Sequence, residues 1–192
     1  MVTDMQTSLP PVVEIWAWLD SVSDPEIPVL SVIDLGILRS VSWTEGNQDA
    51  TLIVTITPTY SGCPAIAVIK EDILMTLRQH GLTRVRIETQ LSPAWTTDWM
   101  TERGRKRLVG YGIAPPDARE PDCSAPVRGL KVGLASEAAL HGLASEARSI
   151  GIACPRCGSS DTRLVSRFGS TPCKAFHICN SCLEPFDHFK CH

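Results

Sequence analysis

The stretch ATLIVTITPTYSGCPAIAVIKEDILMTLRQHG, residues 50–81, decides the fold of the first half of the chain. Residues 50–59 are rich in β-branched and apolar side chains, which is typical of a strand. After the turn sequence YSGC, apolar side chains recur at helical spacing and form one stripe: Ile66, Ile69, Ile73, Leu74 and Leu77. Gly81 is a typical C-terminal stop for a helix. The stretch therefore predicts a strand that leads through a tight turn into a helix.

The flanking segments complete a small α+β or α/β domain. Residues 35–43 also resemble a strand, and the turn-rich TEGNQD between them and residues 50–59 predicts an antiparallel hairpin. Residues 83–92 alternate as a strand, so strand, helix and strand predict a right-handed crossover. The expected order is helix, β-hairpin, helix and strand.

The first helix is expected just before the hairpin, with Pro11 in its first turn and one apolar face: Val12, Ile15, Trp16, Leu19 and Val22. It should end near Ser23, because the sequence DPEIP places two prolines within residues 24–28. Asp24, Pro25 and Glu26 then form a rigid acidic turn.

Residues 96–109 predict a further short helix, with Thr97 or Asp98 as its cap. The basic run RGRKR, residues 103–107, is interpreted as a solvated helix face without a function of its own.

The aromatic residues divide the chain into two small cores. All five tryptophans precede residue 100, and all four phenylalanines follow residue 160. The intervening sequence loses its apolar periodicity and contains the hexamer GLASEA twice, so we expect a tether. The predicted organisation is an α+β or α/β domain over residues 1–114, a linker over 115–150 and a small C-terminal module over 151–192.

Composition excludes some classes of protein. A net charge of -3 argues against a protein that coats nucleic acid or an anionic membrane. The N-terminal residues lack the features of a signal peptide, and no apolar stretch is long enough to cross a bilayer, so we expect a cytoplasmic protein without a membrane partner. In a reducing compartment, eight cysteines indicate metal or redox chemistry rather than structural disulfides.

Two C-x-x-C pairs near the C-terminus predict a zinc ribbon: Cys154 with Cys157, and Cys179 with Cys182. A two-residue gap lets both thiolates of a pair reach one ion, and two pairs complete a tetrahedron. Gly158 suits the tight turn after the first pair. Zinc is the expected metal and iron in a rubredoxin-like site is the competitor. So small a module should depend on its metal for stability.

Cys173 and Cys191 are not explained by this count. Either could replace a ribbon ligand, or they could form a second site together with histidines of the same segment: His177, His188 and His192. They could equally be small buried residues. A nucleic-acid-binding ribbon is a further hypothesis, but the last 42 residues have only a weak excess of basic side chains.

Cys63 has no other cysteine near it in sequence. Its place at the start of a helix predicts an activated thiolate, because backbone amides and the helix dipole stabilise negative charge there. His80, at the far end of the same helix, is too distant to act as a base, so nucleophilic catalysis is not expected. An inert cysteine in a turn remains the alternative.

Several motifs resemble known families. DPEIPVLSVIDLGIL and TPTYSGCP, with the following helix, resemble the SufT-like iron-sulfur assembly family. SPAWTTDWMTERGRKRL, YGIAPP, CPRCGS, FGSTPCKAF and CLEPFDHFKCH resemble its PaaD branch, found in phenylacetate degradation. The likeness covers residues 12–116 and 152–192, and residues 117–150 depart from the pattern.

The resemblance implies a non-enzymatic maturation factor for the phenylacetyl-CoA epoxidase system, with its iron-sulfur reductase and oxygenase components as partners. It assigns cluster transfer to Asp24, Glu26, Thr59 and Cys63, the last flanked by Gly62 and Pro64. One cysteine cannot hold a cluster that usually takes four thiolates. A transient cluster at Cys63 must therefore be shared with a second copy in a homodimer, a partner, or ligands such as Glu26. A non-catalytic subunit that assembles the oxygenase through its zinc ribbon is the alternative.

Overall fold

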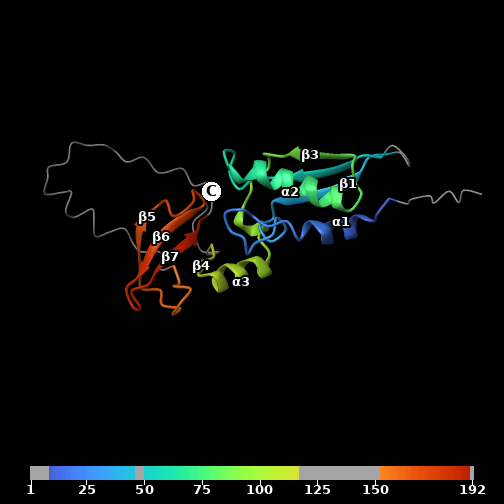
Figure 1. The fold of residues 1–192 in the computed structure, drawn as a ribbon. Coiled ribbons are helices and arrows are strands. Elements are labelled where there is room, and N and C mark those ends of the chain that lie inside the picture. The colour runs from blue at the N-terminus through green and yellow to red at the C-terminus, as the bar shows by residue number, and fades with distance from the viewer. Residues whose placement is uncertain (1–8, 46–49, 117–151, 191–192) are drawn as a thin grey trace, which may run out of the picture. The chain divides into compact units, whose positions relative to one another are not determined.

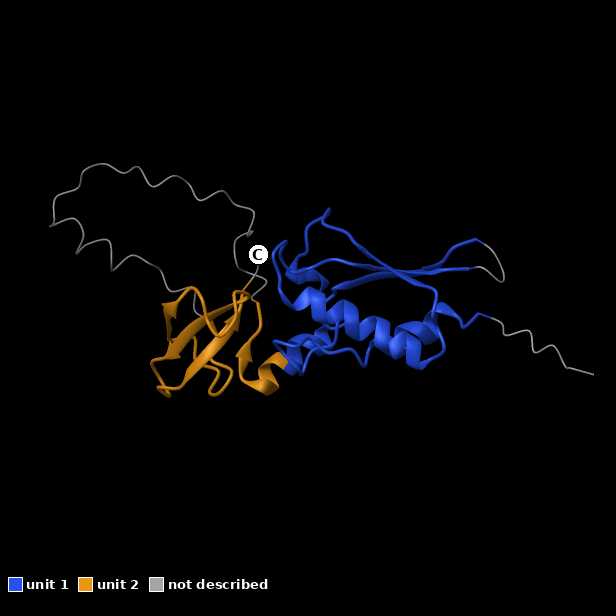
Figure 2. Cartoon of the chain, turned by 45° about the horizontal axis from the view of Figure 1, so that its top comes forward, with its two compact units in different colours: residues 1–107 blue, residues 108–192 orange. Residues whose placement is uncertain are grey.

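The computed structural model describes residues 9–45, 50–116 and 152–190. The chain divides into two compact units, residues 1–107 and residues 108–192 (Figure 2). None of the helices in the described ranges is long and apolar enough to cross a membrane.

The first unit is built on a three-stranded sheet with the order β1-β2-β3 (Figure 1). β1 (Leu38–Trp43) and β2 (Leu52–Ile56) are antiparallel, and β3 (Val85–Thr89) runs parallel to β2. The predicted hairpin and the parallel strand–helix–strand connection are therefore confirmed. The strands are shorter than the sequence suggested, because residues 35–37 and 57–59 continue as irregular backbone.

α1 (Val12–Leu19) and α2 (Ala65–Gln79) pack against each other and against the sheet. In α1, Ile15 and Leu19 of the predicted stripe are fully buried, but Val12 and Trp16 are only half-buried, and the helix ends at Leu19 rather than near Ser23, so Val22 lies beyond it. In α2, Ile69, Ile73 and Leu77 are fully buried. The central strand supplies the opposite wall of this core with Leu52, Val54 and Ile56. Ile66 and Leu74 are only half-buried at the edge of the stripe.

The helix expected over residues 96–109 is two elements. A 3-10 turn, η1 (Thr97–Trp99), precedes α3 (Glu102–Tyr111), and Met100 between them is extended. The backbone N–H of Gly104 donates to Thr101 Oγ1 at 2.9 Å, which makes Thr101 the cap of α3. The prediction of Thr97 or Asp98 as the cap is therefore wrong.

The interpretation of residues 103–107 as a solvated face is also wrong for two of its arginines. Arg103 Nε and Arg107 Nη1 each lie 2.6 Å from a carboxylate oxygen of Asp34, whose side chain is fully buried. Lys106 faces solvent and has only a long contact of 3.8 Å with Glu102.

The second unit contains a four-stranded sheet with the order β4-β7-β6-β5. β5 (Thr162–Ser166), β6 (Lys174–Cys179) and β7 (Pro185–Phe189) form an antiparallel meander. β4 (Ile113–Ala114) pairs in parallel with β7, so residues at the end of the predicted first domain contribute to this sheet. Both GLASEA hexamers lie outside the described residues.

Replacing Ile73 with alanine should lower the free energy of unfolding of the first unit by about 2–5 kcal/mol, because the change leaves a cavity among fully buried side chains. Tryptophan fluorescence during urea unfolding reports on this unit, since all five tryptophans precede residue 100. Met75→Ala, on the exposed side of the same helix, is the matched control and should change stability by less than about 0.5 kcal/mol. Equal losses in both variants would contradict this account of the core.

Candidate functional site

Cys63 lies in the connection between the central strand β2 and helix α2. The turn that carries it is closed by the Cys63 N–H, which donates to the carbonyl oxygen of Tyr60 at 3.2 Å. The backbone N–H groups of Ala65 and Ile66, at the start of α2, donate to the Cys63 sulfur, and so does the hydroxyl of Thr59. Fold and sequence thus place three donors around one half-buried thiol.

The electrostatics of Cys63 differ from the expectation of an activated thiolate. Burial raises the pKa of the Cys63 thiol, and this effect outweighs the opposing hydrogen bonds from Ala65, Thr59 and Ile66. The carboxylate of Glu26 raises the pKa further. Burial therefore disfavours the thiolate of Cys63, and the three hydrogen bonds favour it.

The acidic turn meets Cys63 through Glu26 rather than through Asp24. Asp24 is buried, and its Oδ1 accepts hydrogen bonds from the N–H groups of Glu26 and Ile27, both at 2.8 Å. The structure therefore brings Cys63, Thr59 and Glu26 together, and Asp24 shapes the backbone that presents Glu26.

His80 does not serve this site. It lies just beyond the last residue of α2, where its ring stacks on Trp18 with a centroid separation of 4.0 Å.

The two C-x-x-C pairs of the second unit converge as predicted. The sulfur atoms of Cys154, Cys157, Cys179 and Cys182 all lie within 4.8 Å of one another. Two of the separations are 3.7 Å, between Cys154 and Cys182, and 3.6 Å, between Cys157 and Cys179. A tetrahedral ion with metal–sulfur bonds of about 2.3 Å requires sulfur atoms about 3.8 Å apart. The donor set and its spacing therefore fit a four-thiolate metal ion.

The two metal-binding turns have matching backbone geometry. In the first, Gly158 has φ +75° and donates its N–H to the Cys154 carbonyl at 2.8 Å. In the second, Leu183 occupies the same position with φ +64° and donates to the Cys179 carbonyl at 3.0 Å. The sequence predicted the glycine, but nothing in it indicated a left-handed leucine.

The two thiols of the second pair, Cys179 and Cys182, have opposite pKa shifts in the absence of a metal. The N–H of Cys182 donates to Cys179 and helps to lower its pKa to about 7. The N–H of Glu184 lowers the pKa of Cys182, but burial and the neighbouring sulfur atoms outweigh it and raise that pKa to about 12. A bound divalent cation removes this conflict by stabilising every thiolate at once.

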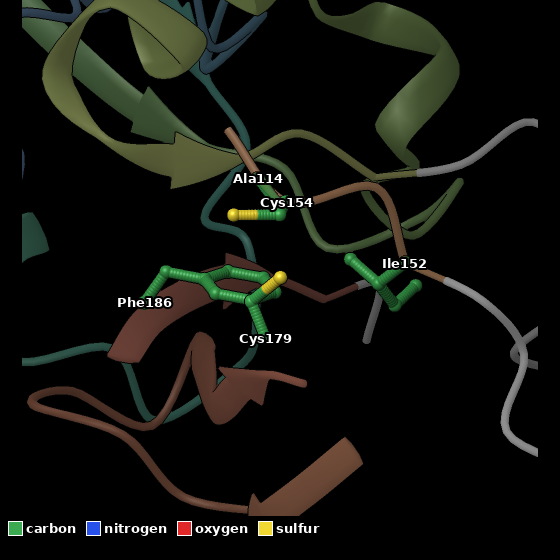
Figure 3. Close-up of a cluster of buried hydrophobic side chains, with 5 residues drawn as sticks. All are labelled: Ala114, Ile152, Cys154, Cys179 and Phe186. Atoms are coloured by element: carbon green, nitrogen blue, oxygen red, sulfur yellow. The ribbon is translucent and has the colours of Figure 1, made fainter. Parts of the chain in front are cut away.

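The metal-binding turns pack on a small apolar cluster. The cluster contains five buried residues: Ala114 in β4, Phe186 in β7, and Ile152, Cys154 and Cys179 (Figure 3). These apolar contacts anchor the two metal-binding turns to β4 and β7.

Cys173 does not join the four sulfur atoms. It is buried, and its sulfur lies 2.9 Å from the Thr171 hydroxyl. His177 and His188 are buried beside each other, with ring centroids 5.5 Å apart. In the described ranges, the ribbon cysteines are the only group of three or more side chains arranged to hold a metal. Cys191 and His192 lie outside those ranges.

Comparisons with known proteins agree with this division. Residues 13–88 match the family of iron-sulfur cluster assembly proteins, and residues 141–190 match the PaaD zinc beta ribbon domain. The fold and the two cysteine sites thus define an iron-sulfur assembly domain followed by a metal-binding zinc ribbon.

One relative is similar along nearly its whole length. It is a protein of Escherichia coli (strain K12) named as one of the subunits of a "Putative 1,2-phenylacetyl-CoA epoxidase", and it is 45% identical over 97% of this chain and 98% of its own. The chain belongs to this family, the PaaD family.

Two further proteins are similar to about half of the chain. A Porphyromonas gingivalis "Fe-S protein maturation auxiliary factor" is 37% identical over 47% of this chain and 83% of its own. Among solved structures, a DUF59 domain from Bacillus anthracis is similar at a TM-score of 0.46 and 24% identity, over 50% of this chain and 90% of its own.

Cys157→Ser should abolish stoichiometric metal binding and unfold the ribbon, because three thiolates and a hydroxyl hold the ion far less tightly than four thiolates. Metal analysis of the purified protein and the NMR signals of β5 to β7 measure both effects. Cys173→Ser is the matched control and should retain the metal. Loss of metal from the Cys173 variant would show that the ligand set extends beyond the four sulfur atoms.

Leu183→Gly should stabilise the metal-loaded ribbon by about 1 kcal/mol, because glycine adopts a left-handed conformation without the steric cost that leucine has there. The Leu183 side chain is 76% exposed, so little packing is lost. The thermal midpoint of the ribbon should rise in this variant. Leu183→Ala removes the same side chain but keeps a Cβ, and an equal rise in that control would refute the explanation.

Proposed function

We propose that this protein is an iron-sulfur maturation factor whose first unit carries a cluster at Cys63 and passes it to an acceptor. The acceptor is the iron-sulfur reductase component of the phenylacetyl-CoA epoxidase system, with the oxygenase as a further partner. The protein is an accessory factor rather than an enzyme. The relative's name supports the system, and the matched assembly domain supports the role.

The proposal rests on the surroundings of Cys63: hydrogen-bond donors that favour its thiolate are present, but no group of further metal ligands surrounds it among the described residues. Three hydrogen-bond donors face the Cys63 sulfur, and Glu26 lies beside it. Among the residues that the structure describes, Cys63 belongs to no group of three metal-ligating side chains. A cluster bound here is held incompletely by one chain, so its remaining ligands come from a second copy or from the acceptor. Incomplete ligation favours release.

Protonation gives the site a route to release its cargo. Because burial holds the pKa of Cys63 above its ordinary value, the thiol regains its proton readily once the cluster moves to acceptor thiolates. Thr59 and the two amides stabilise the thiolate only while the metal is bound.

The ribbon has a different part in this proposal. Zinc is its resident metal, held by all four cysteines, and the ribbon serves as a docking module. Exposed apolar side chains on the ribbon, Leu164, Phe168 and Leu183, also favour a second candidate function, namely a subunit that assembles the oxygenase without handling a cluster.

The test is anaerobic reconstitution of the full zinc-loaded chain with iron and sulfide, followed by transfer to the reductase apoprotein. Cys63→Ser should bind no cluster and reduce transfer at least tenfold, and Thr59→Val should weaken cluster retention by loss of one donor. Visible absorption and the electron-transfer activity of the reductase give the two readouts.

Cys173→Ser is the control, since it alters another buried cysteine outside the ribbon ligands. If Cys63→Ser supports transfer as well as the wild type does, the carrier role is excluded. If instead ribbon variants lose co-purification with the oxygenase while the reductase cluster stays intact, the assembly subunit is the correct function.

A further inference from the structure

The acidic turn beside Cys63 is a closed loop with a narrow neck. Asp24 N–H donates to the Leu30 carbonyl at 2.9 Å, and Val32 N–H donates to the Val22 carbonyl at the same distance. Ser23 and Ser31 form an isolated antiparallel bridge between these contacts. The loop over residues 24–30 therefore moves with its neck, and Glu26 moves with the loop.

Two carboxylates stand on opposite sides of this neck. Asp20 precedes the neck and accepts a hydrogen bond from the Ser31 hydroxyl at 2.7 Å. Asp34 follows it, and its N–H donates to the same hydroxyl at 3.1 Å. Ser31 thus links the two carboxylate-bearing segments at the base of the loop.

A single guanidinium bridges both carboxylates. Arg103 Nε donates to Asp34 Oδ1 at 2.6 Å, and Arg103 Nη1 donates to Asp20 Oδ2 at 2.7 Å. The planar fork of arginine has donors in fixed directions, so it can hold two acceptors at once in a way that an ammonium cannot. Arg107 Nη1 and the Thr101 hydroxyl donate two further hydrogen bonds to the Asp34 carboxylate. Of these three donors, only Arg103 also bridges to Asp20.

We propose that Arg103 is a positioning residue for cluster transfer, which fastens the neck of the 24–30 loop and so keeps the Glu26 carboxylate within electrostatic reach of Cys63. This inference rests on the proposed function, because it assigns Glu26 and Cys63 to one transfer site. Arg103 is 83 residues from Asp20 and 69 from Asp34 in sequence, and it touches neither Glu26 nor Cys63 in any contact above. Its effect is transmitted through the backbone of the neck.

The test is the pH dependence of Cys63 alkylation by iodoacetamide in the zinc-loaded full chain, followed by mass spectrometry of the Cys63 peptide. Glu26→Gln should shift the profile to lower pH, since a carboxylate raises the pKa of a neighbouring thiol. In an Arg103→Gln background, Glu26→Gln should add no further shift, because the carboxylate has already left the site.

Arg103→Lys keeps the charge but cannot bridge both carboxylates, so it should behave as Arg103→Gln does. Lys106→Gln, on the solvent side of α3, is the matched control and should retain the full shift on Glu26→Gln. A full Glu26 shift in the Arg103→Gln or Arg103→Lys background would overturn the proposal. If both arginine variants fail to fold, Asp20→Asn decides, because it removes one bridged carboxylate and should reduce the Glu26 shift.

Alkylation requires no iron, so the outcome is separable from the proposed function. Coupling between Arg103 and Glu26 in a protein that transfers no cluster would refute the carrier role but keep the positioning role. Cluster transfer by the wild type without this coupling would refute the positioning role but keep the carrier role.

Discussion

Asp34 lies with its side chain fully buried against two guanidinium groups, and this ion pair organises the first unit. Burial raises the pKa of Asp34, but the hydrogen bond from Arg103 helps to keep it below its ordinary value. A charge without a partner in that position would be costly, so the segment before β1 and helix α3 have to fold onto each other. The backbone is fitted to the same contact, because a Cβ on Gly104 would lie 2.9 Å from the Asp34 carbonyl oxygen. The same ion pair holds the 24–30 loop in place.

The two units are stabilised by different kinds of interaction. The first has an apolar core between a sheet and two helices, supported by the Asp34 ion pair. The second packs a small apolar cluster around Phe186 against its metal-binding turns and also buries Phe189, and its four ribbon cysteines form one metal-binding group. In the proposed function, resident metal and transient cargo are separated chemically: the ribbon offers four ligands to one ion, and the first unit offers one thiol to a cluster.

The sequence predicts the local elements well because they depend on periodicity and spacing. The apolar stripe of α2, the hairpin and the C-x-x-C pairs are all visible within short windows, and the structure confirms them.

The partners of Arg103 lie 69 and 83 residues away in sequence, so no short window reveals them, and the sequence alone favours a solvent-exposed helix face for the basic run. The prediction of an activated Cys63 thiolate was wrong for a related reason: its helix-terminal amides are local, but the burial that raises its pKa comes from the tertiary fold. The two-residue strand β4 carries no pattern at all, and its pairing with β7 follows from the packing of Ala114 on the ribbon cluster.

In the proposed function, cluster and zinc occupy different cysteines. Native mass spectrometry of the anaerobically reconstituted chain tests this most directly, because it weighs metal, sulfide and subunits together. We expect a zinc ion in every chain and a cluster only in species that contain a second chain or the acceptor. The Cys63→Ser variant should carry no cluster. A cluster bound to a single chain in place of zinc, and unaffected by Cys63→Ser, would contradict this expectation.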